Sequence, residues 1–582
     1  MMQPFTIECK KHCMLFDANL NSRIKNYQSY TPIYKELFNT DTDNNTDTDM
    51  TLNYNTIIDS IESVDSYNNF IGTSIHNNDH VHMFAKFCPL FDPLKTLIGK
   101  RLTHNISLPK CNEKTHIFSD KNNSAYVDAF FYYLSSKLLH HHGFVHGIDC
   151  FGSVLAIQKQ FRIDIQDDLE YLFESDYFLE HRKSFNISDD IYENFEPVET
   201  RKHKKMLIIS DDRVEIDNII TIDKTLPDST QNHTEPKSDD LVYIKKRASE
   251  SGSVSEHSNK TSSTCSSRSS ITTDEDDEDE AEEDEDEGDD EGDDEGDDED
   301  DEDEEDEDDE DEDADEDEDD NEEDDDEDEE KPIYAEIKEF PVNIVFLEAC
   351  KETLDQYITD NNDGIEVKEW EAILMQIVMM LVVLQEKFYF IHNDLHSSNV
   401  MYVDTDKPFL YYKYEEIYYK VPTYGKIWKV IDFGRAIYKI KGVVMFSDSF
   451  SKDGDASTQY NCEPYLNTKK NIVPPNFSFD LCRLATSLYD VIEEDDDLKE
   501  VFTLIESWMT DDKGRNILYK QNGDERYPDF KLYKMIARSI HGSIPKNQLS
   551  LPIFSQYSVS KKNIKQHKKS IMDISKIPCY VD

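Results

Sequence analysis

The 582-residue chain lacks the features that mark secreted and membrane proteins. Its ten cysteines form no regular framework and are scattered singly apart from Cys9 and Cys13, which argues against a disulfide-stabilised extracellular domain. The opening residues show no apolar core or cleavage site of a secretory signal. The longest apolar run, residues 373–384, contains Gln376 and is too short to cross a bilayer. We therefore expect a soluble, intracellular protein with free thiols and no membrane partner.

Positive charge is also scarce, since 61 Lys and Arg residues stand against 127 Asp and Glu residues and leave a formal net charge of -66. Most of this imbalance comes from Asp274–Glu330, a tract in which nearly every residue is acidic. Like charges at this density repel and have nothing apolar to bury, so residues 225–332 are predicted to be disordered. The tract argues against direct nucleic-acid binding, because phosphates would be repelled. It suits basic partner proteins, or it serves only as a solubilising insert.

Apolar periodicity predicts regular structure on both sides of this insert. Apolar positions at helical spacing indicate helices at 124–139, 367–388 and 478–492. Residues 340–358 indicate a buried strand followed by the start of a helix, and 426–434 indicate a further strand that ends in glycine. The chain is therefore predicted to be of the α+β class.

The stretch "FIHNDLHSSNVMYV", residues 390–403, places a polar loop between two apolar segments. Asn399 follows five positions after Asp394, and a later strand ends at Asp432, directly before Phe and Gly. Carboxylate and carboxamide oxygens are hard ligands suited to Mg²⁺, and Asp394 could orient an attacking hydroxyl or accept its proton. Placement and charge neutralisation supply most of the catalysis of phosphoryl transfer, so this residue set points to that chemistry.

Here the sequence resembles the protein-kinase superfamily. "HNDLHSSN" is similar to the catalytic loop H-R-D-x-x-x-x-N, and "DFG" at 432–434 is similar to the magnesium motif. The preceding helix, the segment "VFLEACKETL" and the helix "FDLCRLATSLYD" follow in the family's order over about residues 340–495. The resemblance implies that Asp480 pins the backbone of the catalytic loop. It also implies an adenine-binding hinge at Glu348 and Cys350, a catalytic set of Asp394, Asn399 and Asp432, and Mg²⁺ on the last two of these.

The resemblance also requires a nucleotide-binding lobe with a Gly-rich loop, a strand Lys and a helix acid. Gly72 precedes Lys86, which lies on an apolar strand, and the downstream helix offers Asp128, one methylene shorter than the usual Glu. A rival, Lys159, lies only seven residues after Gly152, which leaves no room for two strands and a turn. We therefore expect Lys86 to contact the phosphates of ATP and Asp128 to hold it.

Several positions depart from the family pattern. Asn393 stands where an Arg would let a phosphorylated loop dock, which argues against that mode of control. His396 stands where ordinary protein kinases carry Lys, and this loop is also similar to that of aminoglycoside and choline kinases and of haspin-like protein kinases. The gap between Asp394 and Asp432 is about twice the family's usual spacing and fits an extra hairpin.

We therefore expect a bilobal, protein-kinase-like α+β fold with a small β-rich N-lobe, a larger helical C-lobe and a long disordered acidic insert within the N-lobe. The expected parts are a polar extension at 1–69, the N-lobe at 70–224, the insert at 225–332, the hinge and C-lobe at 333–555, and a basic tail at 556–582. Residue usage and the insert resemble those of serine/threonine protein kinases of giant DNA viruses of the mimivirus type, which would place the protein in the host cytoplasm or the virion.

The expected function is that of an ATP- and Mg²⁺-dependent phosphotransferase acting on Ser or Thr of proteins. Two alternatives remain open. A small-molecule kinase is supported chiefly by His396. A pseudokinase that binds basic partners through the acidic insert is supported by the poor Gly-rich loop, and it is opposed by the retention of Asp394, Asn399 and Asp432 together.

Overall fold

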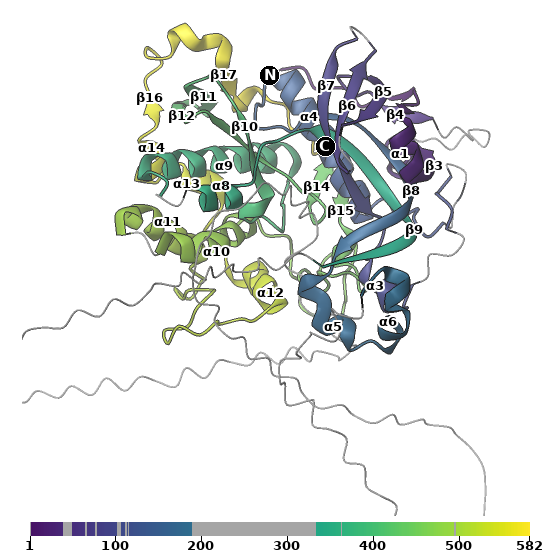
Figure 1. Ribbon diagram of the computed structural model, residues 1–582. Helices are drawn as coiled ribbons and strands as arrows, with labels where there is room; N and C mark the ends of the chain where they lie inside the picture. The colour runs from purple at the N-terminus through teal and green to yellow at the C-terminus, as the bar shows by residue number, and fades with distance from the viewer. Residues whose placement is uncertain are drawn as a thin grey trace, which may run out of the picture. The chain divides into compact units, whose positions relative to one another are not determined.

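The computed structural model describes residues 2–38, 49–64, 67–75, 78–101, 106–110, 113, 116–188, 333–361, 364–493 and 496–582 (Figure 1). All elements given below belong to one compact unit, which takes in the described residues up to 188 and from 334 onward. The predicted disordered insert at 225–332 lies outside the described residues.

A seven-stranded sheet has the order β2-β5-β6-β7-β9-β8-β3. All neighbouring pairs are antiparallel except β2 and β5, which run parallel. Strand β9, which lies between β7 and β8, ends at the predicted hinge residue Glu348. The strands are β2 (Leu15–Phe16), β3 (Ile24–Gln28), β5 (Ile58–Ser63), β6 (Asn69–Ser74), β7 (His80–Pro89), β8 (Cys150–Asp164) and β9 (Tyr334–Glu348).

The first 69 residues differ from the expected polar extension, because three of their strands belong to this sheet. Ile58 and Ile61 of β5 are buried, and the ring of Phe16 lies 6.1 Å from that of Phe346 in β9. Two further segments, β1 (Cys9–Lys11) and β4 (Met50–Leu52), pair with each other. The predicted boundary between residues 69 and 70 therefore falls inside β6, which pairs with β5.

Helix α4 (Ser124–His142) confirms the predicted helix and packs against β8 and β9. The side chain of Asn123 accepts a hydrogen bond from the N–H of Ala125, which caps the start of the helix. The helix ends at Gly143, whose φ of 67° is a left-handed conformation that glycine adopts without steric cost. Asn343 of β9 donates to the carbonyl of Ala125 at 3.0 Å and thereby fixes the helix to the sheet.

The second half of the chain is mainly helical and is built around α9 (Val367–Phe388), which has the predicted bounds and is buried along most of its length. None of the helices in the described part of the chain has the length and apolar character needed to cross a membrane. The other longer helices are α8 (Leu354–Asp360), α10 (Phe479–Glu493), α11 (Lys499–Met509) and α12 (Phe530–Ser539). The shorter ones are α1 (Ala18–Arg23), α2 (Ile33–Phe38), α3 (Leu94–Leu97), α5 (Leu169–Phe173), α6 (Asp176–His181), α13 (Pro545–Gln548) and α14 (Pro552–Ser555).

Short strands surround the polar loop. Strand β10 (Val400–Asp404) follows the loop and pairs with β13 (Lys426–Val430), and between them the predicted extra hairpin is confirmed as β11 (Phe409–Tyr414) and β12 (Ile417–Pro422). Two strands from the expected basic tail join this hairpin, so that segment is part of the folded unit. These are β16 (Ser558–Val559) and β17 (Ile571–Asp573), and a separate hairpin follows Asp432 as β14 (Ile437–Ile440) and β15 (Val443–Phe446).

Candidate functional site

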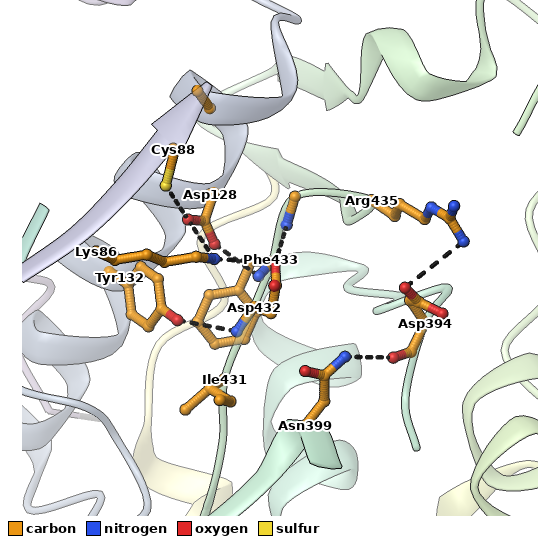
Figure 2. Close-up of polar contacts among 12 residues, drawn as sticks. Lys86, Cys88, Asp128, Tyr132, Asp394, Asn399, Ile431, Asp432, Phe433 and Arg435 are labelled. Atoms are coloured by element: carbon orange, nitrogen blue, oxygen red, sulfur yellow. Dashed lines mark hydrogen bonds and ion pairs between the residues drawn. The ribbon is translucent and has the colours of Figure 1, made fainter. Parts of the chain in front are cut away.

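Lys86 lies between two carboxylates that come from distant parts of the sequence. Its Nζ is 2.9 Å from Oδ2 of Asp128 on α4 and 2.9 Å from Oδ1 of Asp432, which follows β13 (Figure 2). Asp128 is 1% exposed, whereas the side chain of Asp432 is 28% exposed. The ammonium therefore has one fully buried carboxylate behind it and one that solvent can reach.

The two carboxylates stabilise the charge of Lys86, whereas burial raises the pKa of Asp128. Burial alone would lower the pKa of Lys86, but Asp128 and Asp432 outweigh it and hold that pKa well above its usual value. The thiol of Cys88 and the backbone N–H of Phe433 also donate to Asp128, at 3.2 and 2.7 Å. Lys86 is therefore a fixed cation near neutral pH.

The backbone at Asp432 is held in an uncommon conformation. Its φ is 62°, in the left-handed region that non-glycine residues seldom adopt. Its N–H donates to the hydroxyl of Tyr132 at 2.8 Å, and the next N–H, of Phe433, donates to Asp128. The ring of Phe433 is 1% exposed and lies edge-on to the rings of Phe131 and Tyr132. Helix α4 therefore sets the position of both Lys86 and Asp432.

Asp480, the first acidic residue of α10, anchors the backbone of the polar loop. Its carboxylate accepts hydrogen bonds from the backbone N–H groups of His392 and Asn393 at 3.0–3.1 Å. This confirms the predicted structural role of Asp480. The imidazole of His392 contacts the carbonyl of Ile431 at 2.8 Å and joins the loop to the residue before Asp432.

Asn393 is completely buried rather than available to a docking group. Its side-chain oxygen accepts from the hydroxyl of Tyr460 at 2.6 Å, and its amide donates to the carbonyl of Arg435 at 2.9 Å. A neutral side chain satisfied in this way offers no charge to a phosphate. The expectation that control by phosphorylation is absent stays a prediction.

Asp394 is nearly buried and lies among cations. Its Oδ1 accepts from the hydroxyl of Tyr533 at 2.9 Å, and its Oδ2 lies 3.5 Å from a guanidinium nitrogen of Arg435. Burial alone would raise the pKa of Asp394, but Arg435 in the first place, and then His396 and Arg483, lower it to about 2. The carboxylate is therefore ionised and able to accept a hydrogen bond from a hydroxyl at neutral pH.

Asn399 uses its amide nitrogen within the loop. The nitrogen donates to the carbonyl of Asp394 at 2.9 Å and approaches Nε2 of His396 at 3.0 Å. Burial lowers the pKa of His396 to about 4, so this ring is neutral and can accept. The side-chain oxygen of Asn399 accepts no hydrogen bond from the residues that the structure describes, and the same holds for Oδ2 of Asp432. These two oxygens are the ones that fit a hard cation.

Metal binding by protein groups alone finds no support here. Within the described ranges, no group of three or more His, Cys, Asp or Glu side chains is placed to hold an ion. Mg²⁺ commonly takes only one or two protein oxygens and completes its shell with water and substrate phosphates. Asn399 and Asp432 fit that pattern, which requires a phosphate ligand at the same time.

The other predicted cofactor contacts are not brought into this cluster. Gly72 lies within strand β6, not in a turn, and a Cβ at this position would come 2.6 Å from the side chain of Met83. The assignment of Gly72 to a phosphate-binding loop therefore gains no support and stays a prediction. Glu348 forms an ion pair with the buried Lys429 of β13. Burial raises the pKa of the Cys350 thiol to about 12, so this thiol is neutral.

Three residues of the site are not among those predicted from the sequence. Tyr132 supports the backbone of Asp432, Arg435 faces Asp394, and Tyr533 donates to Asp394 from α12. Tyr132 lies four residues after Asp128, so it faces the same side of α4, and that spacing was a usable signal. Tyr533 offered none, because it is 139 positions away from its partner.

Comparison with known proteins gives one short match. Over 63 residues the chain is 35% identical to a probable serine/threonine-protein kinase of Dictyostelium discoideum. The match covers 10% of this chain and 5% of that relative, and no family model matches the chain. It is a similarity to a kinase over a short segment, and it lends no support to the resemblance to giant-virus kinases.

Proposed function

We propose that this protein is an ATP- and Mg²⁺-dependent phosphotransferase with a bilobal protein-kinase-like fold, acting on Ser or Thr hydroxyls of proteins. The observation that carries the proposal is the ion-paired bridge from Asp128 through Lys86 to Asp432. A cation fixed between a buried and an accessible carboxylate is suited to phosphate oxygens. The short similarity to a probable serine/threonine-protein kinase supports the same reading.

Each residue then has a specific task. Lys86 would attract phosphate oxygens on the solvent-accessible side of its ion pairs, where Asp432 lies. Asp432 and Asn399 would hold Mg²⁺, which when bound neutralises developing charge on the phosphates. Asp394, ionised by its cationic neighbours, would accept the hydrogen bond of the incoming hydroxyl and fix its direction.

The small-molecule alternative loses part of its basis in the structure. His396 was its main support, but this ring contacts the amide nitrogen of Asn399 and is neutral. Its contact lies within the loop, and it serves to orient Asn399. The pseudokinase alternative keeps its support, because Gly72 lies within strand β6 and not in a turn.

Calorimetric titration with Mg-ATP separates a functional nucleotide site from a scaffold. Asp432→Ala removes an accessible carboxylate, so we expect Mg-ATP affinity to fall at least about tenfold while thermal stability changes little. Asp406→Ala, at an exposed position after β10, is the matched control and should bind as the unchanged protein does. Equal affinity in all three proteins would contradict the metal role of Asp432.

Phosphate transfer is tested separately with radiolabelled ATP and a mixture of protein substrates. We expect labelled Ser or Thr in the presence of Mg²⁺ and no label after its chelation. Binding of Mg-ATP without transfer to any protein would favour the scaffold, and transfer to small alcohols alone would favour the small-molecule kinase.

A further inference from the structure

Tyr533 reaches the predicted catalytic carboxylate from helix α12. Its hydroxyl donates to Oδ1 of Asp394 at 2.9 Å and accepts from Nε of Arg483 at 2.8 Å. Tyr533 is 4% exposed, and Arg483 belongs to α10. Two helices and the polar loop therefore meet in one hydrogen-bonded chain, which ends on the carboxylate of Asp394.

The ring of Tyr533 is held on several sides. The guanidinium carbons of Arg483 and Arg435 lie 5.2 and 5.7 Å from its centroid. The rings of Phe530 and Phe479 lie at 5.4 and 6.0 Å. Movement of the ring would break these contacts together, so the hydroxyl has a fixed place relative to Asp394.

This arrangement fixes the carboxylate of Asp394 at both oxygens. The phenol holds Oδ1, and the guanidinium of Arg435 faces Oδ2 (Figure 2 shows the latter contact). A phenol that accepts a hydrogen bond from an arginine is polarised and becomes a stronger donor to its own acceptor. Rotation of the carboxylate about its Cβ–Cγ bond is therefore restricted.

We propose that Tyr533 is a positioning residue for phosphate transfer, which orients the carboxylate of Asp394 toward the acceptor hydroxyl. The inference rests on the proposed function. It makes α12 part of the acceptor side of the site. The alternative is that the hydroxyl of Tyr533 occupies the position of the acceptor hydroxyl. In that case, removing it would increase the rate of phosphate transfer.

Tyr533→Phe keeps the ring and removes only the hydroxyl. We expect kcat to fall about tenfold with Mg-ATP affinity unchanged. Tyr527→Phe, in the same segment and 8% exposed, is the matched control and should leave both quantities unchanged.

Arg483→Lys changes the other end of the same hydrogen-bonded series and leaves Tyr533 unchanged. It should lower kcat by a smaller factor with Mg-ATP affinity unchanged, so the inference does not depend on one variant folding well. Thermal melting of each variant identifies any loss that reflects instability alone.

A double variant gives the decisive readout. If Tyr533 acts through Asp394, Tyr533→Phe should have no further effect on the residual rate of Asp394→Asn. An equal loss in both backgrounds, or faster transfer by Tyr533→Phe, would overturn the role of Tyr533 alone. Absence of transfer by the unchanged protein would overturn the proposed function, and the inference with it.

Discussion

Asp448 accepts a 2.8 Å hydrogen bond from the backbone N–H of Ser124, the first residue of α4. The other oxygen of Asp448 receives the side-chain amide of Asn123 at 3.3 Å. Asp448 follows β15 in the segment after Asp432, so this contact ties that segment to the start of the helix that carries Asp128. A carboxylate at a helix N-terminus satisfies free N–H groups and interacts favourably with the helix dipole.

The burial of Asp448 makes stability depend on pH. Burial raises the pKa of Asp448 to about 7, and Asp120 and Asp455 add to this, although the N–H of Ser124 opposes it. The folded state therefore binds this proton more tightly than the unfolded state does. The stabilisation is complete below the unfolded value near 4 and is lost as pH rises through about 7.

Asp448→Asn keeps an acceptor for Ser124 and removes the titration. Between about pH 5 and pH 8 we expect the unfolding free energy of the unchanged protein to fall relative to that of the variant by about 2 kcal/mol. Denaturant titrations at several pH values measure this difference. Asp453→Asn, exposed in the same segment, should run parallel to the unchanged protein. Parallel curves for Asp448→Asn would show that Asp448 does not titrate in this range.

The polar loop could be predicted from the sequence because its pattern is local. Asp394 and Asn399 lie within one short segment, and Asp432 ends a strand that apolar residues mark clearly. The prediction of Lys86 has a weaker basis, because it depends on the number of residues needed to form strands before the helix. The structure places Lys86 on β7 in contact with Asp128 and Asp432, whereas the kinase-like fold itself stays a prediction.

Long-range pairing accounts for what the sequence did not reveal. Strands β2 and β3 have two and five residues and lie between polar segments, so their apolar signal is too short to separate from loops. Gly72 invites a loop assignment, yet it lies within strand β6 beside Met83 of the neighbouring strand. In the sequence, Tyr533 is recognisable only as a tyrosine on an amphipathic helix. Its contact with Asp394 arises from tertiary packing.

The two candidate lysines differ in ways that substitution can measure. Lys86 is buried between two carboxylates, whereas Lys159 lies exposed on β8 and donates to the carbonyls of Asn21 and Ser22. Lys86→Met should lower phosphate transfer at least about tenfold by removing the fixed cation. It should also lower the unfolding free energy by about 3 kcal/mol, since Asp128 stays buried without its partner.

Lys159→Met serves as the matched control, because it removes an ammonium from the same sheet. We expect its transfer rate, Mg-ATP affinity and melting temperature to stay close to those of the unchanged protein. A rate loss in Lys159→Met together with normal transfer by Lys86→Met would reverse the assignment of the phosphate-binding lysine.

Asp394→Asn tests the carboxylate with the smallest possible change. The amide keeps an oxygen for Tyr533, but it removes the charge that faces Arg435 and the group that would receive the acceptor hydroxyl. We expect turnover to fall at least about a hundredfold, because positioning and proton acceptance at the hydroxyl are lost together. Mg-ATP affinity, measured by calorimetry, should change little, since Lys86, Asn399 and Asp432 are untouched. Asp404→Asn, on the exposed end of β10, controls for the loss of one carboxylate. Near-normal transfer by Asp394→Asn would show that another group directs the hydroxyl.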